Sequence, residues 1–594
     1  MIDKKFRLLR KIIPAILFTF VNSKSNAQLP PVLVKKIENK VTVDVLKRYL
    51  ITPQRIVWKT NDTLVQNAEQ LLEKGNGQAY FGNQTLCQLT NNNNITSAII
   101  LDFGVEIHGG IQITTSDGNN KTPKVRICFG ESVSETFSNT MNLPSKDGAT
   151  NHHSMRDFDM ALPGYGTIEV GSTGFRFVRI ELLEPNTSIK IKEIKAVALL
   201  RDLPYLGSFR CNDEKLNKIW ETAAYTVHLN MQEYLLDGIK RDRMVWAGDL
   251  HPEIMTISTV FGYQEIVPKS LDFLKETTPL PKFMNGIPSY SMWWVIMQYD
   301  WYQSHGKLDY LKQQEQYLEE LLDFLKTYVD DDGKEQLQNV GMRFLDWPSY
   351  KDEKAVHAGL QALMVMTFEK GGLLMQVLGN KGKATDFFSI AKKMKKYVPD
   401  SNNSKEAASL LSLAGMINPD NAEEIINKNG AENFSAYFGY YMLSAQAKAG
   451  AYSDALNNIK SYWGRMLDLG ATTFWEEFDI KEAEGAASID EIVNADKKDY
   501  HKNSGDHCYP GLRRSLCHGW SSGPLPWMTE NILGVKIIEP GGKKIKIEPH
   551  LGDLKWVEGS FPTAYGVIYI KHKVGQNGKI ETEVKSPKGV IIVK

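Results

Sequence analysis

Three patterns of hydrophobic and polar positions follow one another along the chain. Between about residues 95 and 200, apolar and polar positions alternate in short β-rich runs such as Ala98–Phe103, Lys124–Phe129 and Phe175–Leu183. Clusters of Gly and Asn separate these runs, as turns separate strands. This part of the chain therefore predicts a β-sandwich.

From about Cys211 the apolar period changes to 3.6, which indicates helices, and Asn212 or Asp213 is the expected N-cap of the first. Two apolar stripes at helical spacing are Leu216, Ile219, Trp220, Ala223, Ala224 and Val227, then Leu311, Leu318, Leu321, Leu322 and Leu325. Helical segments continue to about residue 460. About 320 residues of helix and loop hold roughly a dozen helices, which favours a helical toroid over a four-helix bundle.

Strands return after about Gly534, in Lys543–Glu548, Trp556–Ser560 and Gly566–His572, separated by Pro-Gly and Asn-Gly turns. The predicted fold class is multidomain α+β, with a helical toroid as the central domain between N-terminal and C-terminal β-sandwich domains. The predicted domains are residues 28–207, 208–533 and 534–594.

The first 27 residues have the pattern of a secretory signal peptide. Lys4–Lys11 form a basic n-region, Ile12–Val21 an apolar h-region, and Ser25–Ala27 a small-residue cleavage site. An apolar run of this length, interrupted by Pro14, is far shorter than the roughly 20 residues that span a bilayer. We therefore expect export to the periplasm or the medium, without a transmembrane segment.

The composition, 42% hydrophobic and 10% aromatic, is that of an ordinary globular protein and excludes a disordered chain. Lys and Arg number 70, as do Asp and Glu, and removal of residues 1–27 leaves 64 basic and 69 acidic residues. The resulting charge of −5 supplies no basic field for a phosphate backbone, so no nucleic-acid partner is predicted.

The five cysteines are an odd number without a CxxC pair, which indicates neither a disulfide framework nor a zinc site. Cys508 and Cys517 are close enough in sequence to form a bridge, but buried or half-buried thiols are the favoured interpretation. The sequence contains no metal cluster, calcium-ligand run, dinucleotide or phosphate loop, or GxSxG elbow, so no metal and no cofactor are predicted.

The first segment with candidate catalytic or binding residues is Asp237–Asp249, which contains Arg241, Asp242 and Trp246 between its two terminal aspartates. A Gly-containing loop of this kind makes a pocket wall, in which burial raises the pKa of one carboxyl while arginine keeps another ionised. The alternative is a solvated loop of ion pairs, which composition alone favours.

A second segment, Gly470–Asp479, places Glu476 directly after Trp475. Hydrolysis of a glycosidic bond needs two carboxyl groups, one protonated and one ionised, and indole rings cover the apolar faces of sugars. Most of the 12 tryptophans lie in the helical part, and Trp347 and Trp520, with polar neighbours, are the better site candidates. His518 taken alone is more readily explained as a buried structural histidine.

These ordered motifs resemble those of the α-L-rhamnosidases of glycoside hydrolase family 78. The similar segments correspond to the family's N-terminal β-sandwich, acidic catalytic loop, GATTxWE motif, His-containing segment and C-terminal β-domain. In chain order they are Leu101–Gly104 with Gly174–Arg179, then Asp237–Asp249, Gly470–Glu476, Ser515–Pro524 and Pro540–Gly566. The likeness extends over nearly the whole chain after residue 27.

The resemblance implies an (α/α)6 barrel, an inverting mechanism and release of terminal α-linked L-rhamnose. It implies that Glu476 is the general base that activates water. The residues it implies for binding or orienting the sugar are Asp237, Arg241, Trp246, Asp249, Trp347, Trp475 and His518.

One departure concerns the general acid, because the family's acidic loop carries Glu where this chain has Asp242. The carboxyl is one methylene shorter, and a displacement of ~1 Å costs on the order of 100-fold in rate. Asp242 as acid in an adjusted loop is the favoured interpretation, because Arg241, Trp246 and Asp249 are retained. The alternatives are Glu253 as a substitute acid and a lost or changed activity.

The leading functional hypothesis is an exported inverting glycosidase that trims α-L-rhamnose from an oligosaccharide or polysaccharide. Plant glycosides, pectic fragments and algal polysaccharides such as ulvan are the substrate classes it includes. One alternative is a related glycosidase for a glucuronyl or other deoxyhexosyl residue. A catalytically inactive carbohydrate-binding protein is the next, and a structural or interaction protein is the least supported.

Overall fold

The computed structural model describes residues 31–33, 42–82, 85–92, 95–116, 122–138, 156–505, 508–509 and 511–593. The predicted signal peptide, residues 1–27, lies outside the described residues. The chain divides into two units, Met1–Val45 and Leu46–Lys594, and every element named below lies in the second.

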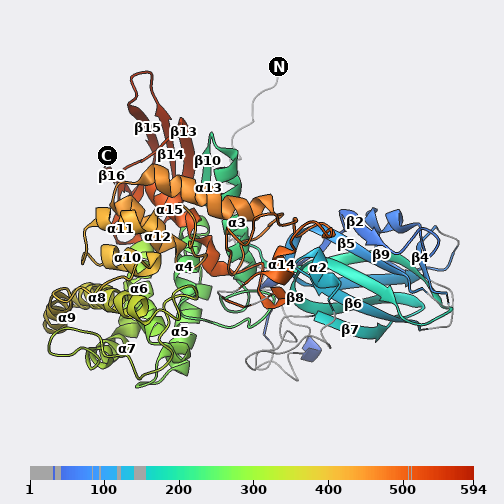
Figure 1. Ribbon diagram of the computed structural model, residues 1–594, viewed down its shortest axis with the longest axis horizontal. Helices are drawn as coiled ribbons and strands as arrows, with labels where there is room; N and C mark the ends of the chain where they lie inside the picture. Colours follow the sequence, from blue (N-terminus) through green and yellow to red (C-terminus); the bar gives the residue numbers. More distant parts are fainter. Residues whose placement is uncertain are drawn as a thin grey trace, which may run out of the picture. The chain divides into compact units, whose positions relative to one another are not determined.

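The N-terminal sheet consists of nine antiparallel strands in the order β3-β4-β9-β5-β8-β6-β7, with β1 paired to β9 and β2 to β5 (Figure 1). The strands are β1 (Leu46–Ile51), β2 (Arg55–Lys59), β3 (Val65–Gln66), β4 (Cys87–Thr90), β5 (Ala98–Ser116), β6 (Lys124–Gly130), β7 (Arg156–Ala161), β8 (Tyr165–Leu182) and β9 (Ser188–Arg201). Register shifts between β5 and β8 bend the long strands, and the apolar side chains form a separate core. The three strand runs predicted for this region correspond to parts of β5, β6 and β8, and the last run extends one residue beyond β8, to Leu183.

Twelve helices of eight residues or more follow in the described part of the chain, which agrees with the predicted dozen. They are α3 (Glu214–Asn230), α4 (Leu250–Val260), α5 (Ile266–Thr277), α6 (Pro288–His305), α7 (Leu308–Lys326), α8 (Glu353–Leu378), α9 (Lys381–Met394), α10 (Lys405–Leu413), α11 (Pro419–Ile426), α12 (Gly439–Lys448), α13 (Tyr452–Asp468) and α15 (Pro524–Asn531). Of the two predicted caps, Asp213 caps α3, because its carboxylate accepts the N–H groups of Lys215 and Leu216.

Six of these helices form a closed ring. Helix α4 contacts α6, and the contacts continue through α8, α10, α12 and α15 back to α4. Helices α3, α7, α9, α11 and α13 pack against members of this ring. A closed ring of six helices with partners packed on it is an (α/α)6 toroid, which is the barrel that the family resemblance implies.

The C-terminal part forms two further sheets, with strand orders β10-β13-β14-β15 and β11-β12-β16. Their strands are β10 (Ser208–Cys211), β11 (Val535–Glu539), β12 (Lys544–Ile547), β13 (Trp556–Thr563), β14 (Gly566–Val574), β15 (Ile580–Lys585) and β16 (Ile591–Val593). Strand β10 precedes the helices in sequence but pairs with β13, and the sheets share one apolar core with the helices. The predicted domain boundaries stay predictions.

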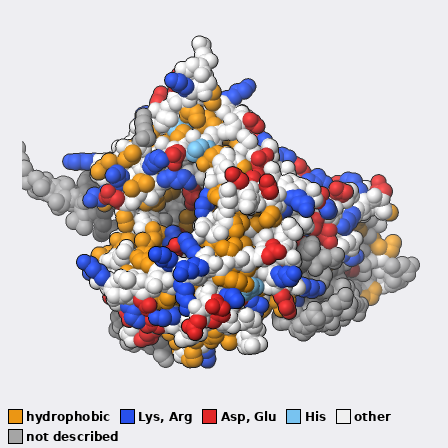
Figure 2. All heavy atoms as spheres, turned by 60° about the vertical axis from the view of Figure 1, so that its left-hand side comes forward, with side chains coloured by type: hydrophobic (Ala, Val, Ile, Leu, Met, Phe, Trp, Pro, Cys, Tyr) orange, Lys and Arg blue, Asp and Glu red, His pale blue; other side chains and the backbone are white. Residues whose placement is uncertain are grey.

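Two further features concern the charges on the surface and the lengths of the helices. On the face drawn in Figure 2, basic and acidic side chains are interspersed, in keeping with their equal numbers in the sequence. Among the described residues, no helix combines the length and the apolar character needed to cross a membrane.

Candidate functional site

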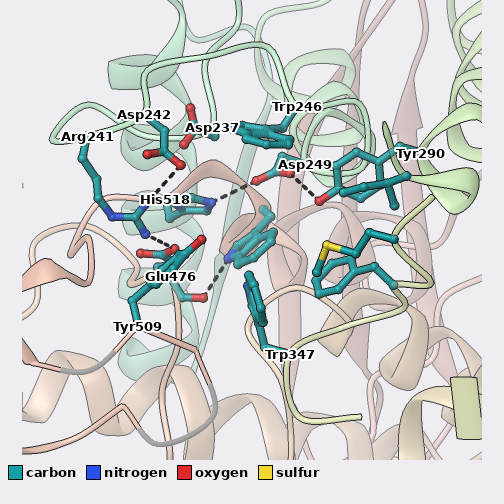
Figure 3. A pocket seen from close by; sticks show the side chains of 14 residues that line it. Asp237, Arg241, Asp242, Trp246, Asp249, Tyr290, Trp347, Glu476, Tyr509 and His518 are labelled. Atoms are coloured by element: carbon teal, nitrogen blue, oxygen red, sulfur yellow. Dashed lines mark hydrogen bonds and ion pairs between the residues drawn. The ribbon is translucent and has the colours of Figure 1, made fainter. Parts of the chain in front are cut away.

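One pocket brings together eight of the nine predicted site residues (Figure 3). They are Asp237, Arg241, Asp242, Trp246, Asp249, Trp347, Glu476 and His518. The remaining lining residues are Ile287, Tyr290, Met342, Phe344, Tyr509 and Trp520. The pocket has an empty volume of about 510 Å³, part of which is open to solvent.

The pocket lies where segments lead into the helices of the ring. Asp249 directly precedes α4, Tyr290 is in the first turn of α6, Trp347 precedes α8, and His518 precedes α15. The N-terminal ends of ring helices therefore converge on the pocket. Of the four carboxyl groups in the lining, Asp249 lies at the N-terminal end of such a helix, where the helix dipole favours negative charge.

Glu476 is held by an arginine and by the backbone. Its Oε1 pairs with Arg241, its Oε2 accepts the Ser515 N–H at 2.9 Å, and its carbonyl oxygen accepts Trp520 Nε1–H at 2.8 Å. Burial raises the pKa of Glu476, but the charges of Arg241 and His518 and the Ser515 N–H outweigh burial and lower it to about 2. The Glu476 carboxyl is therefore ionised at neutral pH, as a general base must be.

Asp237 is in the opposite protonation state. Its side chain is buried, and Oδ1 accepts the Met244 N–H at 2.8 Å. Burial raises the pKa of Asp237 to about 8, so this carboxyl is mostly protonated at neutral pH. The pocket thus contains one ionised and one protonated carboxyl, the two states that glycoside hydrolysis needs.

Asp249 accepts hydrogen bonds from two aromatic side chains of the lining. His518 Nε2 donates to Asp249 Oδ1 at 3.0 Å, and the Tyr290 hydroxyl donates to Asp249 Oδ2 at 3.2 Å (Figure 3). Burial lowers the pKa of His518, but the hydrogen bond to Asp249 and the charge of Glu476 raise it above its ordinary value. Asp249 therefore fixes the orientation of the imidazole and stabilises its charged form.

Asp242 reaches the pocket through an unusual backbone. Asp242 and Arg243 have φ angles of 53° and 55°, in the left-handed region that costs a non-glycine residue about 1 kcal/mol or more. Asp242 Oδ2 lies 3.0 Å from Arg241 NH1, and Arg243 NH1 donates to the Ser172 carbonyl at 2.8 Å. The guanidinium of Arg241 therefore bridges the carboxylates of Asp242 and Glu476. With this left-handed turn, the Asp242 side chain lies in the lining of the pocket.

Two residues considered from the sequence do not line the pocket. Trp475 is fully buried and its ring stacks on Tyr500 at a centroid distance of 5.4 Å. Trp475 and Glu476 are neighbours in a non-helical segment, so one side chain faces the core while the other faces the pocket. Glu253, the alternative acid, is buried in α4 and accepts Asn230 Nδ2–H at 3.2 Å. Cys508 and Cys517 are free thiols.

Several lining residues gave little signal in the sequence. Ile287 and Tyr290 lie at the start of α6, within a run rich in apolar and aromatic residues that reads as buried core. Met342 and Phe344 come from the long segment before α8, which has no periodicity. Tyr509 stacks under Arg241, with the guanidinium carbon 4.3 Å from the ring centroid, a contact that only the fold creates.

The fold and the pocket fit one class of protein. A closed ring of helices, with carboxyl groups and indoles at one end, is the arrangement that the resemblance to six-hairpin glycosidases predicts. Fold alone does not identify a reaction, because unrelated activities use the same scaffold.

Comparisons with known proteins narrow this class. Residues 204–405 match the family model of the bacterial alpha-L-rhamnosidase 6 hairpin glycosidase domain. Residues 534–592 match that of the bacterial alpha-L-rhamnosidase C-terminal domain. An alpha-L-rhamnosidase of Alteromonas sp. (strain LOR) is 23% identical over 540 residues, which is 81% of this chain and 54% of the relative.

Two solved structures share the fold. The GH78 family rhamnosidase of Bacillus sp. GL1 has a TM-score of 0.68 and 20% identity, with 88% of this chain and 55% of that chain covered. The rhamnosidase of Klebsiella oxytoca with rhamnose bound has a TM-score of 0.64 and 20% identity, with 82% and 96% covered. These findings confirm the resemblance to the α-L-rhamnosidases of glycoside hydrolase family 78 and the predicted fold class.

Proposed function

We propose that this chain is an exported α-L-rhamnosidase that releases terminal α-L-rhamnose with inversion. Glu476 is the general base and Asp242 the general acid. The observation that carries the proposal is a pocket lined by indole rings in which Arg241 holds the carboxylate of Glu476 ionised beside three further carboxyl groups. Asp237, Trp246, Asp249, Trp347 and His518 bind or orient the sugar.

The proposed reaction is a single displacement at the anomeric carbon. A water molecule attacks this carbon from the face opposite the leaving group, and the ionised carboxylate of Glu476 accepts its proton. The bond from the anomeric carbon to the glycosidic oxygen breaks, and the acid gives its proton to that oxygen. Attack from the opposite face converts an α-linkage into β-L-rhamnose.

Asp237 is a second candidate for the acid. It lines the same pocket, and its raised pKa of about 8 keeps it mostly protonated at neutral pH without help from a substrate. A general acid works best when its pKa lies near the operating pH, which favours Asp237 on protonation state. Asp242 is favoured by the motif, because it occupies the acid's place beside Arg241.

The side chains that line the pocket also favour a 6-deoxy sugar as the glycone. L-Rhamnose carries a methyl group at C6, and Ile287, Met342 and Phe344 give the pocket an apolar surface on which a methyl group can be buried. A glucuronyl residue would instead add a carboxylate to a pocket that already contains four carboxyl groups. Removing the methyl from water favours rhamnose over its 6-hydroxy counterpart, L-mannose.

A panel of aryl glycosides tests this proposal. We expect turnover of the aryl α-L-rhamnoside, with kcat/KM on the order of 100-fold above that of the aryl α-L-mannoside, because an apolar pocket leaves the extra hydroxyl unpaired. Aryl β-D-glucuronide and aryl α-L-fucoside should be turned over still more slowly. Faster turnover of either would support another glycone, and rhamnose binding without any turnover would support an inactive binding protein.

Export is proposed on the pattern of residues 1–27 alone. The substrate that we propose is a plant, pectic or algal glycan that carries terminal rhamnose.

A further inference from the structure

A buried cluster of charged residues links the N-terminal sheet to the acidic loop. Glu131 directly follows β6, Glu135 lies in the short helix α2 (Val133–Thr136), and Lys240 directly precedes Arg241. Lys240 Nζ lies 2.9 Å from Glu135 Oε1 and 3.4 Å from Glu131 Oε2. All three side chains are at most 3% exposed, so these charges are shielded from solvent and depend on one another.

The same cluster holds the segment that contacts the base. Leu516 N–H donates to Glu131 Oε2 at 2.7 Å, and the Ser515 hydroxyl donates to Glu131 Oε1 at 3.4 Å. The N–H of Ser515 donates in turn to Glu476 Oε2 at 2.9 Å. Glu131 therefore holds the backbone N–H of Leu516, and the N–H of the preceding residue, Ser515, orients the carboxylate of Glu476.

Lys240 attaches to this segment as well. Its ammonium donates to the carbonyl oxygens of Leu512 at 2.6 Å and Arg514 at 3.1 Å. Since Arg241 follows Lys240 in sequence, the position of the Arg241 guanidinium depends on the same contacts. One cluster thus holds both partners of the ion pair between Arg241 and Glu476.

A metal ion is the other explanation for this cluster. Among the described residues, Glu131, Glu135 and His501 have ligand atoms close enough to share a cation. The ammonium of Lys240 already lies against both carboxylates, however, and His501 uses both ring nitrogens, toward Ser132 Oγ at 2.7 Å and the Arg514 carbonyl at 3.1 Å. The ammonium of Lys240 therefore already takes the place beside the two carboxyl groups that a metal ion would need.

Other contacts of the N-terminal sheet reach the same segments. Gly174 N–H donates to the Ile239 carbonyl at 2.9 Å, and Arg156 NH2 donates to the Lys240 carbonyl at 2.8 Å. Arg176 NH1 donates to the Gly470 carbonyl at 3.0 Å, at the start of the segment that carries Glu476. The sheet therefore contacts both segments that carry the proposed catalytic carboxylates.

We propose that Glu131, a residue of the N-terminal sheet region, is a positioning residue for the base Glu476, acting through Ser515, Leu516 and Lys240. This inference rests on the proposed function, because it assigns a role toward the proposed base. It makes the N-terminal sheet part of the active-site support rather than an appended module.

The test compares Glu131→Gln with a matched control. Leu516 N–H and Lys240 share one acceptor oxygen of Glu131, Oε2. Gln either turns its NH2 group toward both donors or offers them a neutral amide oxygen, which is a weaker acceptor than a carboxylate, so both contacts weaken. We expect kcat for the aryl α-L-rhamnoside to fall at least tenfold, with KM changed less than about threefold, because a misplaced base weakens the transition state more than substrate binding.

The control is Glu193→Gln, in strand β9 of the same sheet. Glu193 is also buried, pairs with Lys195 at 2.6 Å and accepts the Gly75 N–H at 3.0 Å, but it contacts neither catalytic segment. We expect its kcat to stay within about threefold of the unaltered chain, because none of its contacts reaches the base. A milder variant, Glu131→Asp, keeps the carboxyl group on a shorter side chain and should give an intermediate loss even where Glu131→Gln folds poorly.

Amide hydrogen exchange of residues 511–520 provides a readout that does not depend on turnover. Glu131→Gln and Glu131→Asp should exchange faster in this segment than the unaltered chain, while Glu193→Gln should not. Lack of turnover in the unaltered chain would contradict the proposed function and leave the exchange comparison to decide the positioning role. Unchanged exchange in both Glu131 variants, or equal loss of kcat in the control, would overturn it.

Discussion

Replacing Glu476 with Gln is expected to lower kcat for an aryl α-L-rhamnoside by about 10³-fold, since a positioned base contributes roughly 10² to 10⁴. Gln keeps the size of the side chain but cannot accept the proton of the attacking water. The fold and the affinity for L-rhamnose should be retained, because Trp246, Trp347 and Asp249 still line the pocket. Steady-state kinetics and isothermal titration with L-rhamnose measure the two quantities.

A matched control for this variant is Glu335→Gln. Glu335 is a buried glutamate in the same helical region that also pairs with an arginine, Arg343, and also accepts a backbone N–H, from Leu337 at 2.7 Å. It does not line the pocket. We expect its kcat to fall far less than that of Glu476→Gln, because neither Glu335 nor Arg343 lines the pocket and only the neighbours of Arg343, Met342 and Phe344, do. Ordinary turnover in Glu476→Gln would rule out the proposed base.

Replacing Asp242 with Asn is expected to lower kcat/KM by about 10²-fold or more for a rhamnoside with a poor leaving group. The loss should be much smaller for an activated nitrophenyl rhamnoside, because a good leaving group departs without a proton. This dependence on the leaving group distinguishes a lost acid from a general disturbance of the pocket. The comparison requires two substrates that differ only in the aglycone.

The same two substrates discriminate between Asp242 and Asp237. An acid must carry its proton, so if Asp237 is the donor, the activity of the unaltered chain falls as the pH rises through about 8, the pKa to which burial raises this carboxyl. In that case Asp237→Asn, rather than Asp242→Asn, shows the selective loss on the poor leaving group. That result would move the acid role to Asp237.

Much of the secondary structure follows from periodicity in this chain. The alternating runs of the N-terminal region and the 3.6-residue stripes of α3 and α7 are local patterns, and the structure has strands and helices at those places. The pairing of β10 with β13 could not be predicted from periodicity. The paired residues Cys211 and Val557 are separated in the sequence by the whole helical domain. Closure of the ring between α15 and α4 is likewise a long-range contact.

The candidate site was visible in part for a chemical reason. Carboxyl groups beside tryptophan and arginine made the residues around Asp242 and Glu476 candidates. Composition alone favoured a solvated loop of ion pairs for Asp237–Asp249, and the resemblance to the family's motifs is what assigned the site. Trp475 shows the limit of that signal, because composition does not indicate which of two neighbouring side chains faces the pocket. The role of Glu131 had no signal in the sequence, since its contacts to Leu516 and Lys240 exist only in the folded chain.

The most direct test of the central claim is proton NMR of the anomeric region while the chain acts on an aryl α-L-rhamnoside. A water molecule activated by Glu476 on the face opposite the leaving group predicts that β-L-rhamnose appears first and then equilibrates with the α-anomer. Initial release of α-L-rhamnose would contradict the single displacement. Absence of free rhamnose would contradict the proposed activity itself.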